Sequence, residues 1–238
     1  MLGDDVRALL GDRVPADHAR QIAAEHWIAR FYAARRDGPR AARVLDLGCG
    51  TGDSVDVFRR FDPEVRWLGV DLESSPEVEA RTREDAEFAV FDGASVPADD
   101  ASLDLVFCKQ VLEHVREPEP LLRDVARVLA PGGWFAGSTS QLEPFHSLSV
   151  WNYTPYGLTT LLEDAGLQVL ELRPCIDGLT LVAQRALGMP RLFDRWWALD
   201  SPLNRAFDFL GARLDVRQRN AIKLLLCGQF CFLARAPS

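Results

Sequence analysis

Three glycines lie at alternate positions directly after a mostly apolar run of residues 44–47. They are Gly48, Gly50 and Gly52. Glycine has no Cβ atom and tolerates positive φ, so such a turn lets the backbone approach a flat or extended ligand closely. In the dinucleotide-binding pattern the third glycine comes one residue later, where this chain has Asp53. Because a carboxylate there would repel a pyrophosphate at the helix N-terminus, the turn predicts a nucleotide-like cofactor other than NAD or FAD.

Carboxylates end the next two apolar runs of the chain. The run that begins at Arg66 ends at Asp71, and the run that begins at Ala86 ends at Asp92. In a nucleotide-binding fold, an acid about twenty residues beyond the glycines accepts the hydroxyl groups of a ribose. Taken alone, each of these acids could instead be a solvated carboxylate at a strand end with no ligand. For Asp71 the two interpretations are about equal, and for Asp92 the solvated one is favoured. Their order after the glycine turn favours a ligand-binding role for both.

These segments resemble the class I S-adenosylmethionine (SAM)-dependent methyltransferases, especially their small-molecule, type 11-like group. The resemblance extends from residue 43 to about residue 140 and includes Gln110–Val115, which follows a fourth apolar run. It implies that Asp46 holds the amino-acid end of SAM and that the glycine turn passes under the methionine and ribose parts. SAM has no phosphate, so an acidic turn is tolerated. The cofactor-binding residues that the resemblance implies are Asp46, Gly48, Cys49, Gly50, Gly52, Asp71, Leu72, Asp92, Gly93, Lys109 and Gln110.

The same resemblance implies the fold. We expect an α/β, Rossmann-like, seven-stranded, mostly parallel sheet with an antiparallel strand seven and helices on both faces. Apolar spacing predicts a helix over Glu119–Leu129 and another that opens at Thr154-Pro155. Between strand six, Leu167–Cys175, and strand seven, Gln229–Arg235, a helical insertion of residues 177–227 replaces a short hairpin. It is a candidate lid, dimer surface or membrane-resting patch, or else a small subdomain that buries its own aromatic side chains.

An apolar stripe over residues 16–36 predicts an N-terminal helix that ends at Asp37-Gly38-Pro39. In the family that this chain resembles, such helices often cover the cofactor pocket. Docking of the stripe on the sheet is the favoured alternative for each side chain. The candidate contacts from this segment are His18, Gln21, His26, Trp27 and Tyr32.

Composition excludes several classes of protein. The 238 residues are expected to form one domain, residues 1–238, and the formal net charge of −8 opposes a nucleic-acid partner. The first residues contain no extended apolar run, and no segment approaches a membrane span, so we expect a cytoplasmic protein. Five cysteines form no C-x-x-C pair and no convincing acidic triad is present, so no metal is expected. A homodimer is left open.

The chemistry follows from the methyl group of SAM, which is already electrophilic. An enzyme then gains most by aligning the acceptor and excluding water. A hydroxyl acceptor also needs a base, and a histidine with an ordinary pKa of about 6.5 suits that task. His146 lies in the loop after strand five and is the preferred base or acceptor anchor, while His114 is the weaker catalytic candidate because the family's histidine there often packs. The candidate acceptor-binding residues are Glu143, Trp151, Tyr153 and Tyr156.

The expected function is therefore methyl transfer to a small-molecule acceptor, with a hydroxyl oxygen favoured, in specialised-metabolite or sugar biosynthesis. Amine and carboxylate acceptors are alternatives, as is an enzyme of this fold that catalyses a reaction other than methylation. A non-catalytic partner subunit is disfavoured because the glycines and strand-end acids are retained. The sequence does not identify the acceptor molecule, since the shape of the loops and of the insertion sets specificity.

Overall fold

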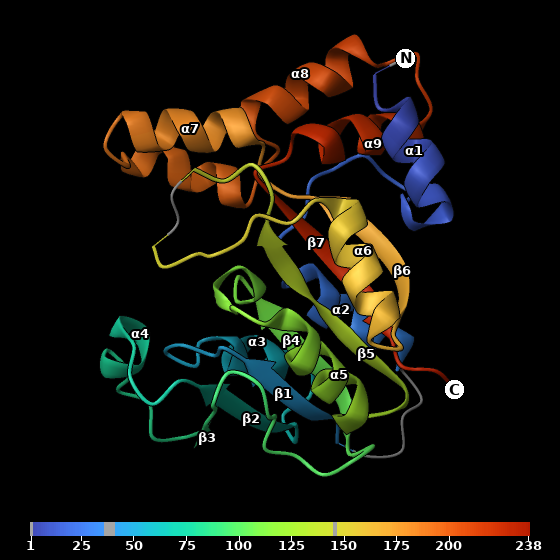
Figure 1. Ribbon diagram of the computed structural model, residues 1–238. Helices are drawn as coiled ribbons and strands as arrows, with labels where there is room; N and C mark the ends of the chain where they lie inside the picture. The colour runs from blue at the N-terminus through green and yellow to red at the C-terminus, as the bar shows by residue number, and fades with distance from the viewer. Residues whose placement is uncertain (1, 36–40, 145–146) are drawn as a thin grey trace.

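The computed structural model describes residues 2–35, 41–144 and 147–238, and these contain a seven-stranded sheet in the order β3-β2-β1-β4-β5-β7-β6 (Figure 1). Strands β1 to β5 are parallel to one another, and β7 lies antiparallel between β5 and β6. The predicted sheet, with its antiparallel seventh strand, is confirmed. The strands are β1 (Arg43–Leu47), β2 (Arg66–Asp71), β3 (Glu87–Val90), β4 (Leu103–Lys109), β5 (Leu129–Ser140), β6 (Gln168–Pro174) and β7 (Gln229–Arg235).

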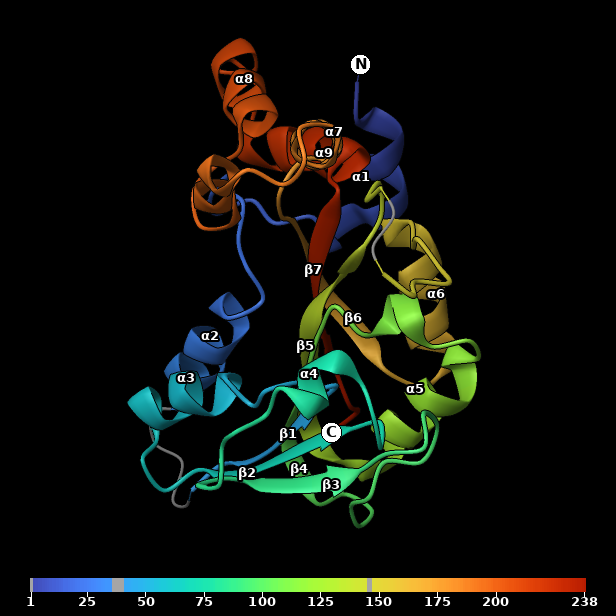
Figure 2. The same ribbon diagram turned by 90° about the vertical axis from the view of Figure 1, so that its left-hand side faces the viewer.

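Helices cover both faces of this sheet (Figure 2). On one face lie α2 (His26–Ala34) and α3 (Ser54–Phe61), and on the other lie α5 (Pro118–Val128) and α6 (Pro155–Asp164). The remaining helical elements are α1 (Asp4–Leu10), η1 (Gly11–Arg13), α4 (Pro76–Glu79), η2 (Leu112–His114), α7 (Gly178–Ala186), η3 (Arg191–Trp197), α8 (Pro202–Leu210) and α9 (Val216–Leu226).

The start of α6 shows how local sequence sets these boundaries. The Thr154 hydroxyl accepts a hydrogen bond from the Gly157 amide at 3.0 Å, and Pro155 occupies the first helical position. A threonine cap satisfies an amide that has no partner within the helix, while proline supplies a helical φ where no donor is needed. The apolar side chains of Leu158 and Leu162 are then four residues apart and face the sheet.

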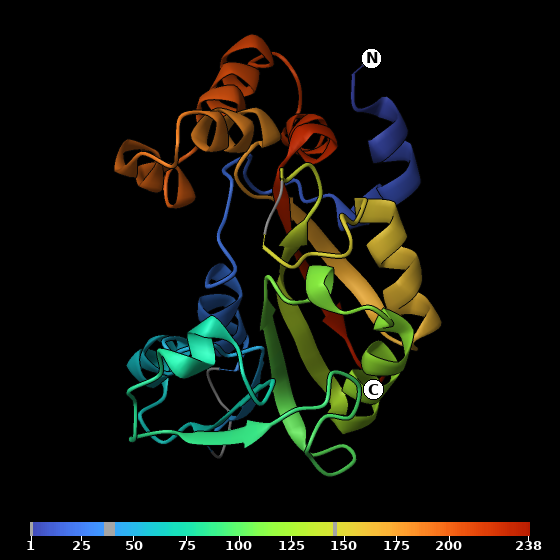
Figure 3. The ribbon, with the colours of Figure 1, turned by 60° about the vertical axis from the view of Figure 1, so that its left-hand side comes forward.

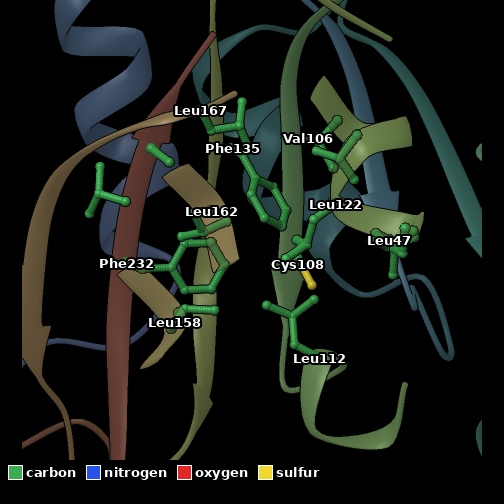
Figure 4. Packing of buried hydrophobic residues seen from close by; sticks show 14 of the residues in the cluster. Leu47, Val106, Cys108, Leu112, Leu122, Phe135, Leu158, Leu162, Leu167 and Phe232 are labelled. Carbon is green, nitrogen blue, oxygen red and sulfur yellow. The ribbon is translucent and has the colours of Figure 1, made fainter. Parts of the chain in front are cut away.

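Two apolar clusters hold the layers together, one on each face of the sheet. The cluster under α5 and α6 includes Phe135 and Phe232, whose ring centroids lie 5.0 Å apart, with Leu158 and Leu162 beside them (Figure 4). The cluster under α2 and α3 includes Trp27, Phe31, Phe58 and Phe107. The sheet is therefore buried on both sides, as its mostly parallel strands require.

The predicted N-terminal helix over residues 16–36 is wrong in its first half. The helix begins only at His26, and residues 14–23 contain no helix. This stretch is held by hydrogen bonds to distant parts of the chain: the Ile22 amide donates to the Pro174 carbonyl at 3.1 Å, and the Gln21 amide donates to Asp200 at 2.8 Å. Tertiary contacts thus override a helical pattern in the sequence.

The burial of Phe232 gives a stability prediction. Phe232→Ala removes a fully buried ring from the centre of the cluster under α5 and α6, so we expect the free energy of unfolding to fall by about 3–5 kcal/mol. Chemical denaturation measures this change. The matched control, Phe209→Ala, removes a ring that is 83% exposed and is expected to shift the value by no more than about 0.5 kcal/mol. Equal losses in the two variants would contradict the packing described here.

Candidate functional site

The glycine turn follows β1 and has a geometry that side chains would prevent. Gly48 and Gly52 have φ values of +70° and +84°. A Cβ atom at Gly48 would lie 2.3 Å from Cγ2 of Val111, and one at Gly52 would lie 2.8 Å from Cζ of Phe88. The turn is therefore packed closely against the residues that follow β4 and against β3, so glycine is needed at both positions for packing within the protein.

Asp46 lies in β1 just before this turn and is buried, with 4% of its surface exposed. Its carboxyl group accepts a hydrogen bond from the Ser54 hydroxyl at the start of α3. The indole nitrogen of Trp67 donates to the same hydroxyl oxygen at 3.1 Å. Burial raises the pKa of Asp46 to about 7, because a charged carboxylate is poorly solvated there. A cation brought to this carboxyl group would restore the charged form.

Asp71 ends β2 beside the turn and is half-exposed. Its carboxylate accepts hydrogen bonds from the Gly50 amide at 2.7 Å and from the Leu72 amide at 2.8 Å. These bonds tie the turn after β1 to the end of β2. The oxygens of a carboxylate hold about four acceptor sites, so capacity remains for a diol.

Arg81 is a residue that the sequence analysis missed. Its guanidinium group donates two hydrogen bonds to the Gly50 carbonyl, at 2.9 and 2.7 Å, and lies 3.9 Å from the centroid of the Phe88 ring. Gly50 is thus held through its amide by Asp71 and through its carbonyl by Arg81. No spacing pattern could have indicated this contact, since the loop after β2 carries several arginines and glutamates.

Asp92 and Gly93 lie just beyond β3, next to the end of β2. The Phe91 amide donates to the Asp71 carbonyl at 2.7 Å, which places the two chain ends side by side. The Asp92 carboxylate accepts from the amides of Ser95, at 2.6 Å, and Ala94, and these bonds lower its pKa. Gly93 has a φ of +92°, and a Cβ atom there would meet nothing within 4 Å. The space beside Gly93 is open.

A buried polar network lies after β4 and β5. Glu113 is fully buried and accepts hydrogen bonds from the hydroxyl groups of Thr139, at 2.9 Å, and Ser140, at 3.1 Å. Burial raises the pKa of Glu113. The Ser140 hydroxyl, whose single proton serves one carboxylate at a time, also lies 2.7 Å from Glu143, and the Gln229 amide group donates to Glu143 at 2.7 Å. This network fixes Glu143, one of the predicted acceptor-binding residues, at the carboxyl end of β5.

A cavity of about 600 Å³ opens at the carboxyl ends of β4 and β5. The segment of residues 22–25 and the insertion between β6 and β7 form its other walls, and these two segments lie side by side beyond the end of the sheet (Figure 3). Lys109 and Glu25 form an ion pair at its edge, with Nζ and Oε1 2.6 Å apart. The lining residues are Ile22, Ala23, Ala24, Glu25, Lys109, Gln110, Ser138, Glu143, Cys175, Ile176, Arg185, Met189, Trp197, Ala198 and Gln229.

The structure brings some of the predicted site residues together and leaves others apart. Lys109, Gln110 and Glu143 line the cavity, and the glycine turn with Asp46 and Asp71 lies at the ends of the adjoining strands β1 and β2. The backbone at Gln110 has a φ of +57°, which marks a sharp change of direction after β4. The cavity and the predicted cofactor residues therefore share the carboxyl edge of the sheet, where ligands bind in such folds.

The predicted aromatic walls lie elsewhere. Trp151 donates from its indole nitrogen to the Val115 carbonyl at 2.9 Å, and the buried Tyr153 donates from its hydroxyl to the Leu112 carbonyl at 3.1 Å. Tyr156 is exposed on α6. None of the three lines the cavity, whose aromatic lining residue is Trp197 of η3. The sequence did not indicate Trp197, because it comes from an insertion with no recognisable motif.

Of the two predicted catalytic histidines, the structure describes His114. His114 is half-buried at the end of η2 and does not line the cavity. His146 lies outside the described residues. It follows Glu143 by three positions in the sequence.

The candidate contacts from the N-terminal segment pack or form structural hydrogen bonds. Trp27 is buried and donates to the Gly137 carbonyl at 3.2 Å, Tyr32 stacks on Phe61, and Gln21 accepts from the Ser201 amide. His18 lies against Arg173. None of these side chains lines the cavity, nor does His26, and the neighbouring residues 22–25 do so instead.

The described residues contain neither a cluster suited to a metal ion nor a helix suited to span a membrane. In residues 2–35, 41–144 and 147–238, no group of three histidine, cysteine or acidic side chains is placed to hold a metal ion. Over the same part of the chain, no helix has the length and apolar character needed to cross a bilayer.

Part of this chain is similar in sequence to known methyltransferases. Residues 45–137 match the family model described as a methyltransferase domain. The chain is 35% identical over 123 residues to trans-aconitate 2-methyltransferase of Variovorax paradoxus, covering 50% of this chain and 48% of that protein. It is 33% identical over 107 residues to a ubiquinone/menaquinone biosynthesis C-methyltransferase of Desulfotalea psychrophila, covering 44% of each. The chain spans about half the length of the curated relatives it matches.

A solved structure shows the same fold over nearly the whole chain. It is a putative sarcosine dimethylglycine methyltransferase from Galdieria sulphuraria, with a TM-score of 0.60 and 16% sequence identity, and the match covers 99% of this chain and 98% of that one. At this identity the likeness concerns the fold.

The pKa of Asp46 predicts how stability depends on pH. Its value of about 7 in the folded protein lies above the ordinary 3.8, so the folded state binds this proton more tightly than the unfolded chain does. Its contribution to the free energy of unfolding is fully present below about pH 4 and is lost as the pH rises through about 7. We expect the difference in the free energy of unfolding between wild type and Asp46→Asn to fall as the pH rises from about 4 through about 7. Urea denaturation at each pH measures this difference.

Asp92→Asn is the matched control for this measurement. Its pKa is lowered by backbone hydrogen bonds, so its contribution is present at neutral pH and is lost as the pH falls below about 4. The contradicting result is a difference in the free energy of unfolding between wild type and Asp46→Asn that stays constant from acid to neutral pH. That result would show that the buried carboxyl group does not titrate as described.

Proposed function

We propose that this chain, a member of the class I SAM-dependent methyltransferases, transfers the methyl group of SAM to a small molecule held in the cavity beside β4. One observation carries the proposal. The 600 Å³ cavity adjoins the glycine turn and the strand-end acids at a single edge of the sheet, through Lys109 and Gln110. Cofactor and acceptor would therefore meet at the end of β4.

The residues around the glycine turn suit the cofactor in shape and charge. The space beside Gly93 is open, which leaves room for part of a ligand at the end of β3. We assign the amino group of SAM to Asp46, whose buried carboxyl group favours a cationic partner, and the ribose hydroxyl groups to Asp71. Asp92 and Gly93 are assigned to the adenine, with Cys49 and Leu72 beside the ligand.

For this reaction the protein mainly has to align the acceptor with the methyl group and exclude water from the site. SAM, when bound, supplies an electrophilic methyl group. The cavity offers an apolar wall from Ile22, Ala24, Ile176 and Met189, which excludes water from the path of attack. Holding the acceptor atom in line with the bond that breaks is an orientation effect, and such effects contribute on the order of 7–11 kcal/mol to catalysis.

The acceptor atom that we propose is a hydroxyl oxygen. Glu143 lines the cavity, and its hydrogen bonds from Ser140 and Gln229 hold it there. With His146, three residues further along the sequence, it would offer a route for the proton that a hydroxyl group must lose as the new bond forms. His114 is kept as the weaker candidate. The relatives named above differ in their acceptors, so they do not select the atom.

The cellular setting is part of the same proposal. We propose a cytoplasmic enzyme of specialised-metabolite or sugar biosynthesis, without a nucleic-acid partner, since a net charge of −8 opposes phosphate binding. A homodimer is compatible with this assignment.

Calorimetry with SAM, followed by transfer of a labelled methyl group, tests the proposal. We expect SAM to bind and the label to pass to at least one member of a panel of hydroxylated acceptors, in preference to amines and carboxylates. Labelling of amines or carboxylates alone would overturn the assignment to oxygen. Binding of SAM with no transfer to any acceptor class would overturn methyl transfer itself.

Asp71→Ala tests the ribose contact. Loss of charged hydrogen bonds worth about 1.5–3 kcal/mol each should raise the dissociation constant of SAM by at least about tenfold in calorimetry. Glu73→Ala is the matched control, because it removes an exposed carboxylate two residues further along the same loop and should leave the constant unchanged. An unaltered constant in Asp71→Ala would remove this role.

His146→Ala tests the base. The variant should retain the SAM affinity of the wild type and lose methyl transfer by about 10²-fold or more, which is the usual contribution of a positioned base. His114→Ala should have a smaller effect on the rate. Turnover that His146→Ala leaves intact would rule out His146 as the base.

A further inference from the structure

The insertion between β6 and β7 exposes an unusual number of large apolar side chains. Phe209, Leu210 and Leu187 have 83%, 78% and 67% of their surface exposed. Within residues 179–210 nine such side chains are exposed, against eleven in all the rest of the described chain. We call these nine residues the insertion surface: Leu179, Val182, Leu187, Met189, Leu192, Trp197, Leu199, Phe209 and Leu210.

The insertion surface lies at the periphery of the molecule. Figures 1 and 3 show α7 and α8 beyond the carboxyl end of the sheet, apart from the layers formed by α3 and α5. Single exposed apolar residues are normal in folded proteins, but a concentration of them in one segment marks a site of interaction.

Exposed arginines accompany these apolar side chains. Arg191, Arg195, Arg205 and Arg213 are exposed, and within residues 2–35, 41–144 and 147–238 none of them forms an ion pair with a carboxylate. Arg195 stacks on the Trp196 ring at 4.4 Å. Between Arg191 and Arg213 the exposed acid is Asp194, since Asp200 and Asp208 are partly buried and hydrogen-bonded, and the exposed Asp215 just beyond forms an ion pair with Arg7. The segment is therefore locally basic in a chain whose net charge is −8.

We propose that the insertion surface docks on an anionic lipid membrane. Apolar side chains with arginine and tryptophan beside them suit the boundary between headgroups and acyl chains. Each arginine near an anionic bilayer contributes on the order of 1 kcal/mol. The net negative charge of the remaining chain would be repelled by the same bilayer, so docking is restricted to this one face.

A second copy of the chain fits this surface poorly. In a two-fold dimer the same patch of each copy meets the other, so the four arginines of one copy would approach those of its partner. Like charges brought together at an interface are unfavourable, and the segment has too few free carboxylates to compensate. An anionic lipid surface supplies the missing negative charge.

Docking would place the cavity at the membrane. Met189 and Trp197 belong to the insertion surface and also line the cavity, together with Arg185 and Ala198. Resting on the proposed function, this continuity indicates an acceptor that is itself lipid-soluble and reaches the cavity from the bilayer. Its apolar body would contact residues such as Ile22 and Ile176, with the reacting group at the end of β4.

Flotation of the full chain with vesicles tests the docking without SAM or any acceptor. We expect binding to phosphatidylcholine vesicles that contain phosphatidylglycerol, at least about tenfold weaker binding to pure phosphatidylcholine, and loss of binding in high salt. Arg205→Ala combined with Arg213→Ala should lower the partition coefficient by on the order of tenfold. Phe209→Ser combined with Leu210→Ser should lower it at least as much.

Matched controls come from β3 and α3, which are not part of the insertion. Val90→Ser removes an apolar side chain that is 66% exposed, and Arg60→Ala removes an exposed arginine of α3, so both should bind vesicles as the wild type does. Equal binding to neutral and anionic vesicles, no binding to either, or equal losses in the control variants would overturn the proposal. So would a concentration-dependent dimer in sedimentation that Phe209→Ser disrupts. Methyl transfer is measured separately, so either proposal can fail while the other stands.

Discussion

The hydrogen bond from the Gly50 amide to the Asp71 carboxylate is the interaction on which the site depends. It ties the turn after β1 to the end of β2, and Arg81 holds the opposite side of the same glycine. Gly48 allows the turn to pack against Val111, which follows β4. One tight bend thereby fixes the relative positions of three strand ends. A ligand that lies across those ends meets groups whose positions the backbone sets, so little ordering is needed when it binds.

The two sides of the proposed active site have different origins. The proposed cofactor side comes from one continuous stretch, residues 45–137, which matches the methyltransferase-domain family model. The acceptor side is assembled from segments far apart in the chain: residues 22–25 before the first strand, Glu143 after β5, and Met189 and Trp197 in the insertion. Hydrogen bonds from Gln21 to the Asp200 carboxylate and the Trp196 carbonyl join the two outer segments. The cavity wall is thus one packed unit despite its dispersed sequence.

This division explains how much the sequence could predict. The strands, the glycine turn and the opening of α6 at Thr154-Pro155 rest on local chemistry, and they agree with the structure. The predicted helix over residues 16–36 is wrong in its first half because residues 14–23 are held by hydrogen bonds to β6 and to the insertion instead of by helical hydrogen bonds. Tyr153 looked like part of an acceptor wall but is buried under α5 and α6. Trp197 lines the cavity through contacts that no spacing rule encodes.

A structure of the protein with bound SAM tests the central claim most directly. The account predicts the ribose on the Asp71 carboxylate, the amino group on Asp46, and the methyl group directed toward Lys109 and Gln110 at the mouth of the cavity. SAM bound away from the ends of β1, β2 and β4, or with its methyl group turned from the cavity, would contradict it.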